Sequence, residues 1–173
     1  MVFAKGIKMK IIVIKGYSKT GKTTVCTSVI SELARRGYSV GSVKDIHFEG
    51  FTLDNENEDT GKHRKAGAST VTALGIYETD IMYGKRLDIR EILSHYDEDF
   101  VVCEGGVDLN CPNIVTGKDK QQLDDRRDEN TIGFSGIIAE ELSEYDGLPV
   151  INGLTDIGAL VDLIEKNAAE YDG

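Results

Sequence analysis

The sequence contains a complete phosphate-binding loop pattern, G-x-x-x-x-G-K-S/T, at residues 16–23. A short apolar run rich in β-branched residues, at 9–15, precedes the loop and predicts a buried strand. Apolar residues at helical spacing follow the loop and stop at 35–37, where two arginines and a glycine are typical of a helix C-terminus. Strand, loop and helix therefore stand in the order that a nucleotide-binding loop requires.

The residue types in the loop fit phosphate chemistry. Gly16 and Gly21 let the backbone turn so that successive N–H groups face phosphate oxygens, and the following helix adds the positive end of its dipole. We expect Lys22 to reach the β- and γ-phosphates and the Thr23 hydroxyl to ligate Mg²⁺. The predicted cofactor is Mg²⁺, and the predicted nucleotide contacts are Gly16, Tyr17, Ser18, Lys19, Thr20, Gly21, Lys22, Thr23 and Thr24.

Two carboxylates follow predicted strands and are candidates for a second set of magnesium ligands. Glu104 comes directly after the apolar run 100–103, and Asp45 directly after the strand predicted at 39–44. Parallel sheets bind ligands at the carboxyl ends of their strands, which would bring both acids to the edge that holds Thr23. We predict Asp45 and Glu104 as metal ligands and, with Lys22, as catalytic residues. The alternatives are a surface acid at Glu104 and a turn-forming residue at Asp45.

The spacing of apolar segments predicts an α/β fold. The helix after the loop and the strand at 39–44 make a βαβ unit, hence a parallel sheet. Strands at 71–74 and 81–83 suggest a hairpin, further strands are expected at 100–103, 132–139 and 148–151, and helices at Asp88 and at Thr155 or Asp156. Residues 117–130 hold many charges around Leu123 and suggest a solvated excursion. We predict a P-loop NTPase fold, a mostly parallel sheet with helices on both faces and an antiparallel hairpin addition.

Length, charge and cysteine usage exclude several classes. A chain of 173 residues can bury a substantial core, and we predict a single nucleotide-binding domain over 1–173. The formal net charge of -10 disfavours nucleic acid as the main partner. No apolar run is long enough to cross a bilayer and no signal-peptide pattern is visible, so we expect no membrane partner. The scattered Cys26, Cys103 and Cys111 suit a reducing cytoplasm and are interpreted as small apolar residues.

An acidic stretch at 54–59 and a basic stretch at 62–65 make a second candidate region. His47, Arg64 and Lys65 are candidates for contact with a substrate or partner, since the basic stretch could meet an anion; the alternative is a solvated surface of mutually neutralised charges. The base of the nucleotide is not specified. Residues 116–119 and 152–156 are imperfect versions of the guanine-binding N-K-x-D pattern, so the residues alone leave GTP and ATP open.

Several segments together resemble the MobB family, GTP-binding accessory proteins of molybdopterin guanine dinucleotide synthesis. The resemblance covers nearly the whole chain and is carried by residues 16–24, 36–38, 43–44, 64–68 and 104–105, with His47, Asp54, Asp59 and Thr60. It implies a homodimer that binds GTP, hydrolyses it slowly and assists a MobA-type guanylyltransferase with the molybdopterin cofactor of molybdenum or tungsten enzymes. This chain departs from the family pattern at Asp45, at 55–58 and at 106–107, around the loop expected to hold pterin or partner.

A different function on the same fold is a small-molecule kinase or ligase that uses ATP or GTP. Such a kinase would be expected to close an arginine-rich lid over the phosphates. Arg126 and Arg127 are the candidates for such a lid, but acidic residues surround them. A non-catalytic, nucleotide-dependent scaffold for a metalloenzyme is a third possibility that sequence does not separate from the accessory GTPase.

Overall fold

The computed structural model describes residues 8–52 and 58–171. The chain forms two units, one from residues 1–45 and 93–173 and the other from residues 46–92, and each is described by itself. The prediction of a single domain over the whole chain stays a prediction.

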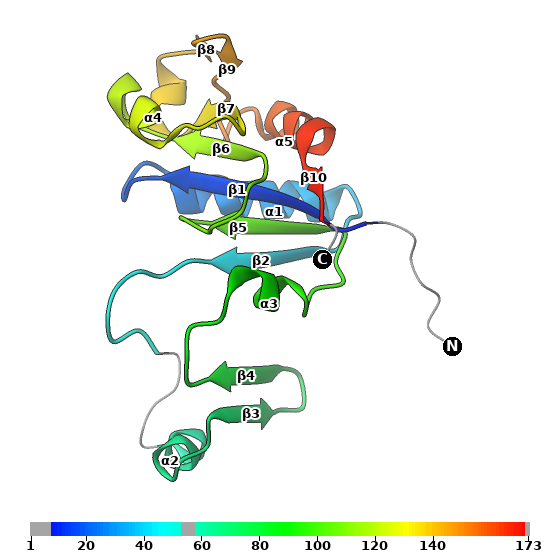
Figure 1. Cartoon of the computed structure of the whole chain (residues 1–173). Coiled ribbons are helices and arrows are strands. Elements are labelled where there is room, and N and C mark those ends of the chain that lie inside the picture. The colour runs from blue at the N-terminus through cyan, green and yellow to red at the C-terminus, as the bar shows by residue number, and fades with distance from the viewer. Residues whose placement is uncertain (1–7, 53–57, 172–173) are drawn as a thin grey trace. The chain divides into compact units, whose positions relative to one another are not determined.

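The first unit is built on a mostly parallel sheet of six strands within the described residues, with β1 between β5 and β6 (Figure 1). The parallel strands lie in the order β2 (Val40–Lys44), β5 (Phe100–Glu104), β1 (Lys10–Gly16), β6 (Asn113–Thr116) and β7 (Thr131–Ser135). A short strand, β10 (Ala169–Glu170), pairs antiparallel with the start of β1. Because β1, β2, β5, β6 and β7 run in one direction, their carboxyl ends meet at one edge of the sheet.

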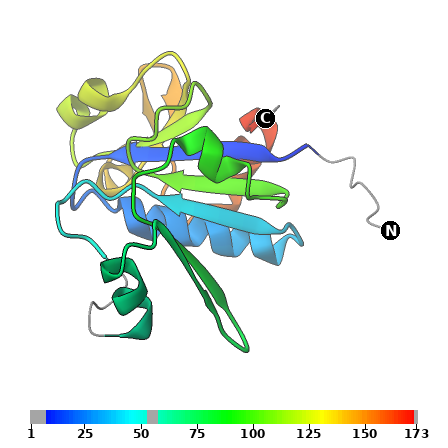
Figure 2. The ribbon, with the colours of Figure 1, turned by 60° about the horizontal axis from the view of Figure 1, so that its bottom comes forward.

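Helices cover both faces of this sheet, as predicted. On one face, Ile12 and Ile14 of β1 lie in a cluster with Val29 of α1 (Lys22–Arg35) and Leu160 of α5 (Ile157–Asn167); Figure 2 shows α1 running along the sheet. On the other face, Val115 packs with Leu123 of α4 (Lys120–Arg126) and with the 3₁₀ helix η1 (Ile137–Glu140). In β6 the alternation of side chains is visible directly: Ile114 belongs to the first cluster and its neighbour Val115 to the second.

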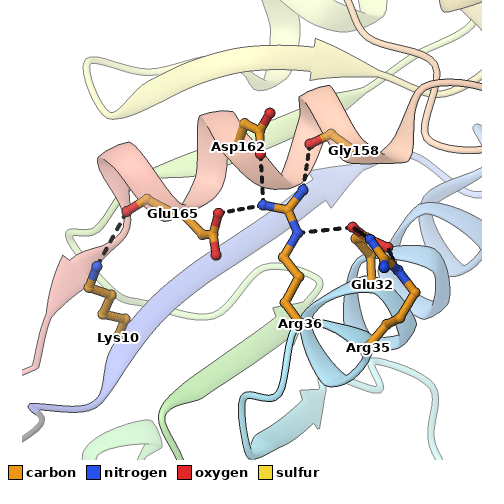
Figure 3. Close-up of polar contacts among 7 residues, drawn as sticks. All are labelled: Lys10, Glu32, Arg35, Arg36, Gly158, Asp162 and Glu165. Carbon is orange, nitrogen blue, oxygen red and sulfur yellow. Dashed lines mark hydrogen bonds and ion pairs between the residues drawn. The ribbon is translucent and has the colours of Figure 1, made fainter.

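The Arg36 side chain at the end of α1 joins that helix to α5 (Figure 3). The Arg36 guanidinium donates to Glu32 of α1 at 2.9 Å and to Asp162 and Glu165 of α5 at 2.7 and 2.5 Å. It also donates to the carbonyl oxygen of Gly158 at 3.0 Å. Arg36, one of the two cations that the sequence indicated as a helix C-terminal signal, thus also joins two helices.

Several segments differ from the sequence prediction. β6 was not predicted, because its apolar pair is flanked by Asn113 and Thr116. The strand predicted at 132–139 was too long: Gly136 has φ +88°, which ends β7 and starts η1. The solvated excursion at 117–130 contains α4, whose single aliphatic residue, Leu123, is fully buried. In 148–151, β9 (Leu148–Pro149) pairs with β8 (Glu144–Tyr145), and a parallel bridge joins Val150 to Phe134.

The second unit contains a short helix and the predicted hairpin. Helix α2 (Asp59–Lys65) includes the basic stretch, and β3 (Thr70–Leu74) pairs antiparallel with β4 (Thr79–Tyr83). The hairpin turn is 75–78, closed by a hydrogen bond of 2.9 Å from the Gly75 N–H to the Glu78 carbonyl. Helix α3 (Ile89–Leu93) follows, and the Asp88 carboxylate accepts the Arg90 N–H at 2.8 Å. Within the described residues of both units, no helix combines the length and apolarity needed to cross a membrane.

Candidate nucleotide and magnesium site

The phosphate-binding loop leads from the end of β1 into the first turn of α1. Gly16 and Gly21 have φ of +147° and +91°, values that favour glycine. Gly21 is the N-cap of α1, no side chain caps that helix end, and its first turn holds no acidic residue. The N–H groups of a helix start are donors for anions, so the loop offers backbone donors of the kind that bind phosphate.

Residues at the ends of β6 and β7 support the loop from behind. Thr20 is fully buried, and its hydroxyl shares a hydrogen bond of 2.7 Å with the hydroxyl of Thr116. The Ile137 N–H donates to the Thr20 carbonyl at 3.2 Å, and a Cβ on Gly136 would lie only 2.4 Å from that oxygen. Thr116 and Gly136 were not predicted as supports of the loop, because β6 was not predicted and the strand at β7 was predicted too long.

Thr23 and Glu104 lie together at the carboxyl edge of the sheet. The Thr23 Oγ1 donates to the Glu104 Oε1 at 2.7 Å. The ammonium of Lys44 donates to the same carboxylate oxygen at 2.6 Å and to the Thr23 Oγ1 at 3.3 Å. Lys44 was not among the predicted site residues, although it pairs with Glu104 in the register of β2 and β5. Knowledge that these two strands pair in parallel would have placed Lys44 next to Glu104.

The Glu104 carboxyl is ionised in this setting. Its side chain is only 11% exposed, and burial raises its pKa. Hydrogen bonds from Lys44 and Thr23 act in the opposite direction and prevail, so the pKa lies below its ordinary value. The site therefore presents a carboxylate, the form that a hard divalent cation requires.

Asp45 lies beside this pair. Its N–H donates to the Glu104 carbonyl at 2.8 Å, and a Cβ on Gly105 would lie 2.9 Å from the Asp45 Cβ. Hydroxyl and carboxylate oxygens suit Mg²⁺, which keeps several waters and takes phosphate oxygens as further ligands. The described residues contain no group of three or more His, Cys, Asp or Glu that could hold a metal alone. This donor set fits Mg²⁺ that arrives with a nucleotide.

The family model for molybdopterin guanine dinucleotide synthesis protein B, MobB, matches residues 11–136. The chain belongs to the MobB family. The match runs from β1 through β7 and so includes the phosphate loop, Asp45 and Glu104.

Individual members of the MobB family show the same relationship. A probable molybdopterin-guanine dinucleotide biosynthesis adapter protein from Bacillus subtilis is 24% identical over 147 residues, 82% of this chain and 84% of the relative. A crystal structure of Bacillus subtilis MobB has a TM-score of 0.70 at 22% identity, covering 94% of this chain and 99% of the other. A MobB homologue from Bacillus stearothermophilus gives 0.66 at 19% identity, with 90% and 96% covered. The predicted P-loop NTPase fold is confirmed.

Other side chains near the loop of this MobB-family chain are engaged within the unit. The Lys22 ammonium donates to the Gly16 carbonyl at 3.0 Å. The Arg126 guanidinium stacks over the Tyr17 ring at 4.1 Å, and Arg127 forms ion pairs with Asp124 and Asp146. These contacts hold α4 against the loop and against the β8–β9 turn. They give no support to a mobile arginine lid of the kinase type.

The two imperfect guanine-binding patterns have local structural roles. The Asp119 carboxylate caps α4 by accepting the Gln122 N–H at 2.9 Å. The Asn152 side-chain oxygen accepts the N–H groups of Leu154 and Thr155 at 2.9 and 3.2 Å. Asx turns and helix caps of this kind account for both segments.

The cysteines of the MobB-family chain match their interpretation as small apolar residues. All three are buried and outside disulfides. Burial raises the pKa of Cys26 and of Cys103 to about 12 and that of Cys111 to about 11. Because the thiolate is the nucleophile, none of them is activated at neutral pH.

The predicted partner residues lie in the second unit. His47 is in the segment after β2, and Arg64 and Lys65 end α2; all three are exposed. Their contact with a substrate or partner stays a prediction. Asp54, one of the positions that carry the family resemblance, lies outside the described residues.

Proposed function

We propose that this chain binds GTP with Mg²⁺, hydrolyses it slowly, and assists the formation of molybdopterin guanine dinucleotide as an adapter. The observation that carries the proposal is the hydrogen bond between Thr23 and Glu104 at the start of a phosphate-loop helix, in a chain of the MobB family. Support for the adapter role comes from the family and from the name of its Bacillus subtilis relative. Maturation of a molybdenum or tungsten cofactor, in the cytoplasm, is the corresponding process.

Each residue has a part in this proposal. The backbone N–H groups between Gly16 and Gly21 bind phosphate oxygens, and Lys22 leaves the Gly16 carbonyl to contact the β- and γ-phosphates. Thr23 and Glu104 would hold Mg²⁺, Thr23 directly and Glu104 directly or through water, and Asp45 would bind a water of the same ion. When bound, Mg²⁺ neutralises charge on the β- and γ-phosphates. The chain's own contribution is to align the phosphates and to exclude alternative positions of the nucleotide.

The preference for guanine rests on the family alone, because one guanine-pattern segment caps α4 and the other forms an Asx turn. Calorimetric titration with GTP, GDP, ATP and ADP, each with and without Mg²⁺, tests it. We expect GTP with Mg²⁺ to bind most tightly, followed by slow release of phosphate that depends on Mg²⁺. Tighter binding of ATP, with transfer of its phosphate to an added small molecule, would instead support the kinase or ligase.

The proposed partners are a MobA-type guanylyltransferase, molybdopterin and a second copy of this chain. The hairpin of the second unit offers a surface for the homodimer, because Leu74, Ile76 and Tyr77 at its tip are 83, 92 and 99% exposed. A hairpin edge can also pair with the same edge of another copy. Sedimentation equilibrium tests the dimer: a monomeric protein at micromolar concentration would contradict it.

A further inference from the structure

The side-chain ammonium of Lys44 contacts the two groups that would hold magnesium. The Lys44 ammonium lies 2.6 Å from the Glu104 Oε1 and 3.3 Å from the Thr23 Oγ1. We propose that Lys44 is a tethered gate of the metal site: it covers both ligands in the nucleotide-free protein and must leave before they can bind Mg²⁺. The inference rests on the proposed function, because the metal and the nucleotide enter through it.

The two partners of this ion pair differ in freedom. The Glu104 side chain is 11% exposed, at the end of a strand that is buried along its whole length. The Lys44 side chain is 53% exposed, on β2 at the edge of the sheet. Glu104 is therefore a fixed ligand, whereas the long, flexible lysine can move into solvent. The pair can open by motion of Lys44 alone.

Charge and position make Lys44 and a metal mutually exclusive. An ion bound to both the Thr23 hydroxyl and the Glu104 carboxylate would take the position near both oxygens that Lys44 holds. Repulsion between the ammonium and a divalent ion adds to this competition. Competition lowers the apparent affinity for the metal by the fraction of protein in which the site is open. Phosphates that bring additional ligands and negative charge overcome it, which ties metal entry to nucleotide entry.

Lys44→Met tests the gate, because methionine keeps an unbranched side chain and removes the charge. Lys166→Met, on the exposed side of α5, is the control for the same change in net charge. The measurement is the Mg²⁺ concentration that gives half-maximal binding of a non-hydrolysable GTP analogue. We expect about a fivefold to tenfold lower concentration for Lys44→Met, the range for a partly exposed pair plus the lost repulsion. Lys166→Met should match the wild type.

The other outcomes overturn the gate. An unchanged Mg²⁺ requirement makes the Lys44–Glu104 contact an ordinary ion pair. A higher requirement, with weaker binding of the analogue, makes Lys44 a phosphate ligand. Thermal unfolding verifies that the variants are folded.

Failure of the proposed function is distinguishable, because it would show in the wild type as no binding of any nucleotide. The gate is then tested by titrating nucleotide-free protein with Mn²⁺ and measuring free Mn²⁺ by electron paramagnetic resonance. Tighter binding by Lys44→Met than by the wild type and Lys166→Met supports the gate. Equal binding, including none by any of the three, overturns it.

Discussion

The Thr23 hydroxyl and the Glu104 carboxylate are 81 residues apart in sequence and form a hydrogen bond of 2.7 Å. The strand pairing explains how they meet. β5 lies beside β1 in parallel register, with Glu104 opposite Ile14, so the end of β5 reaches the loop that follows β1. Thr23 stands in the first turn of the helix that this loop starts. The same edge of the sheet thus carries the proposed phosphate loop and the Glu104 carboxylate, at the place where doubly wound folds bind ligands.

The loop lysine gives the first prediction. In Lys22→Ala the backbone N–H groups of the loop are intact, but the positive charge that faces the β- and γ-phosphates is lost. We expect the affinity for GTP to fall by about tenfold or more, measured by calorimetry, with an unchanged unfolding temperature. Lys166→Ala, with the same change in net charge, should bind normally. Normal affinity in folded Lys22→Ala would refute the assignment of the loop.

The carboxylates give the second prediction. Glu104→Gln keeps the shape of the side chain but removes the charge that a divalent ion requires. Mg²⁺-dependent hydrolysis should fall by about a hundredfold, while metal-free binding of nucleotide changes much less. Asp45→Asn should show the same pattern with a smaller loss. If Asp45→Asn keeps the wild-type Mg²⁺ dependence, Asp45 is a turn residue and not a ligand of metal-bound water.

The carboxyl edge of the sheet at β1 and β5 could be predicted more completely than the rest of the sheet. The loop, β1, β5 and Glu104 have strong local signals, a motif and continuous apolar runs. β6 has only Ile114 and Val115 between two polar residues, yet those polar residues have buried structural roles: the Asn113 side chain is fully buried, and Thr116 supports the loop. A buried polar strand end is satisfied by tertiary hydrogen bonds, which periodicity does not reveal.

The role of Lys44 was hidden for a related reason. A lysine at the end of a strand is usually predicted to be an exposed cation, and the Lys44 side chain is indeed partly exposed. Its position next to Glu104 depends on β2 pairing with β5 and not with β1. Strand order is a non-local property, so only a correct topology brings the lysine to the carboxylate.

Close packing behind the loop gives the third prediction. A Cβ on Gly16 would lie 2.2 Å from the Thr116 Oγ1 and 2.5 Å from the Thr116 carbonyl oxygen. Gly16→Ala should therefore displace the loop and weaken GTP binding by more than tenfold. Gly37 also has positive φ, +93°, but a Cβ there meets no atom within 4 Å. Gly37→Ala should lower the unfolding temperature modestly and leave the affinity for GTP unchanged. The comparison separates the effect of displacing the loop from the effect of a side chain at positive φ.

The joint between α1 and α5 gives the fourth prediction. Arg36 is 20% exposed and donates to two helices, whereas Arg35 is 73% exposed and donates to Glu32 of its own helix (Figure 3). Arg36→Met should lower the free energy of unfolding by about 1–2 kcal/mol, since it leaves three acids near one another. Arg35→Met should change it little. Urea denaturation of both variants measures the difference, and equal effects would contradict the role of Arg36 as the joint.

The same joint predicts an acid-dependent loss of stability. Hydrogen bonds from Arg35 and Arg36 lower the pKa of Glu32 from 4.5 to about 2. A carboxyl whose pKa is depressed in the folded state contributes stability above its unfolded pKa and loses it as pH falls through the folded one. Wild-type stability should therefore fall between about pH 5 and pH 2. The fall should be smaller in Arg36→Met, because part of the interaction that depresses the pKa is already absent.

The basic end of α2 gives the last prediction. Arg64 and Lys65 are exposed in the last turn of a short helix, where cations also interact favourably with the negative end of the helix dipole. Reversal of both charges to glutamate should cost little stability and leave GTP binding intact. If the pair meets a partner or a pterin phosphate, stimulation of a MobA-type guanylyltransferase should be lost. Lys85 and Arg86, an exposed adjacent pair in the same unit, are the control for the same change in charge. Stimulation that survives at 64 and 65, or that is lost equally at 85 and 86, would reduce the basic end of α2 to a solvated surface.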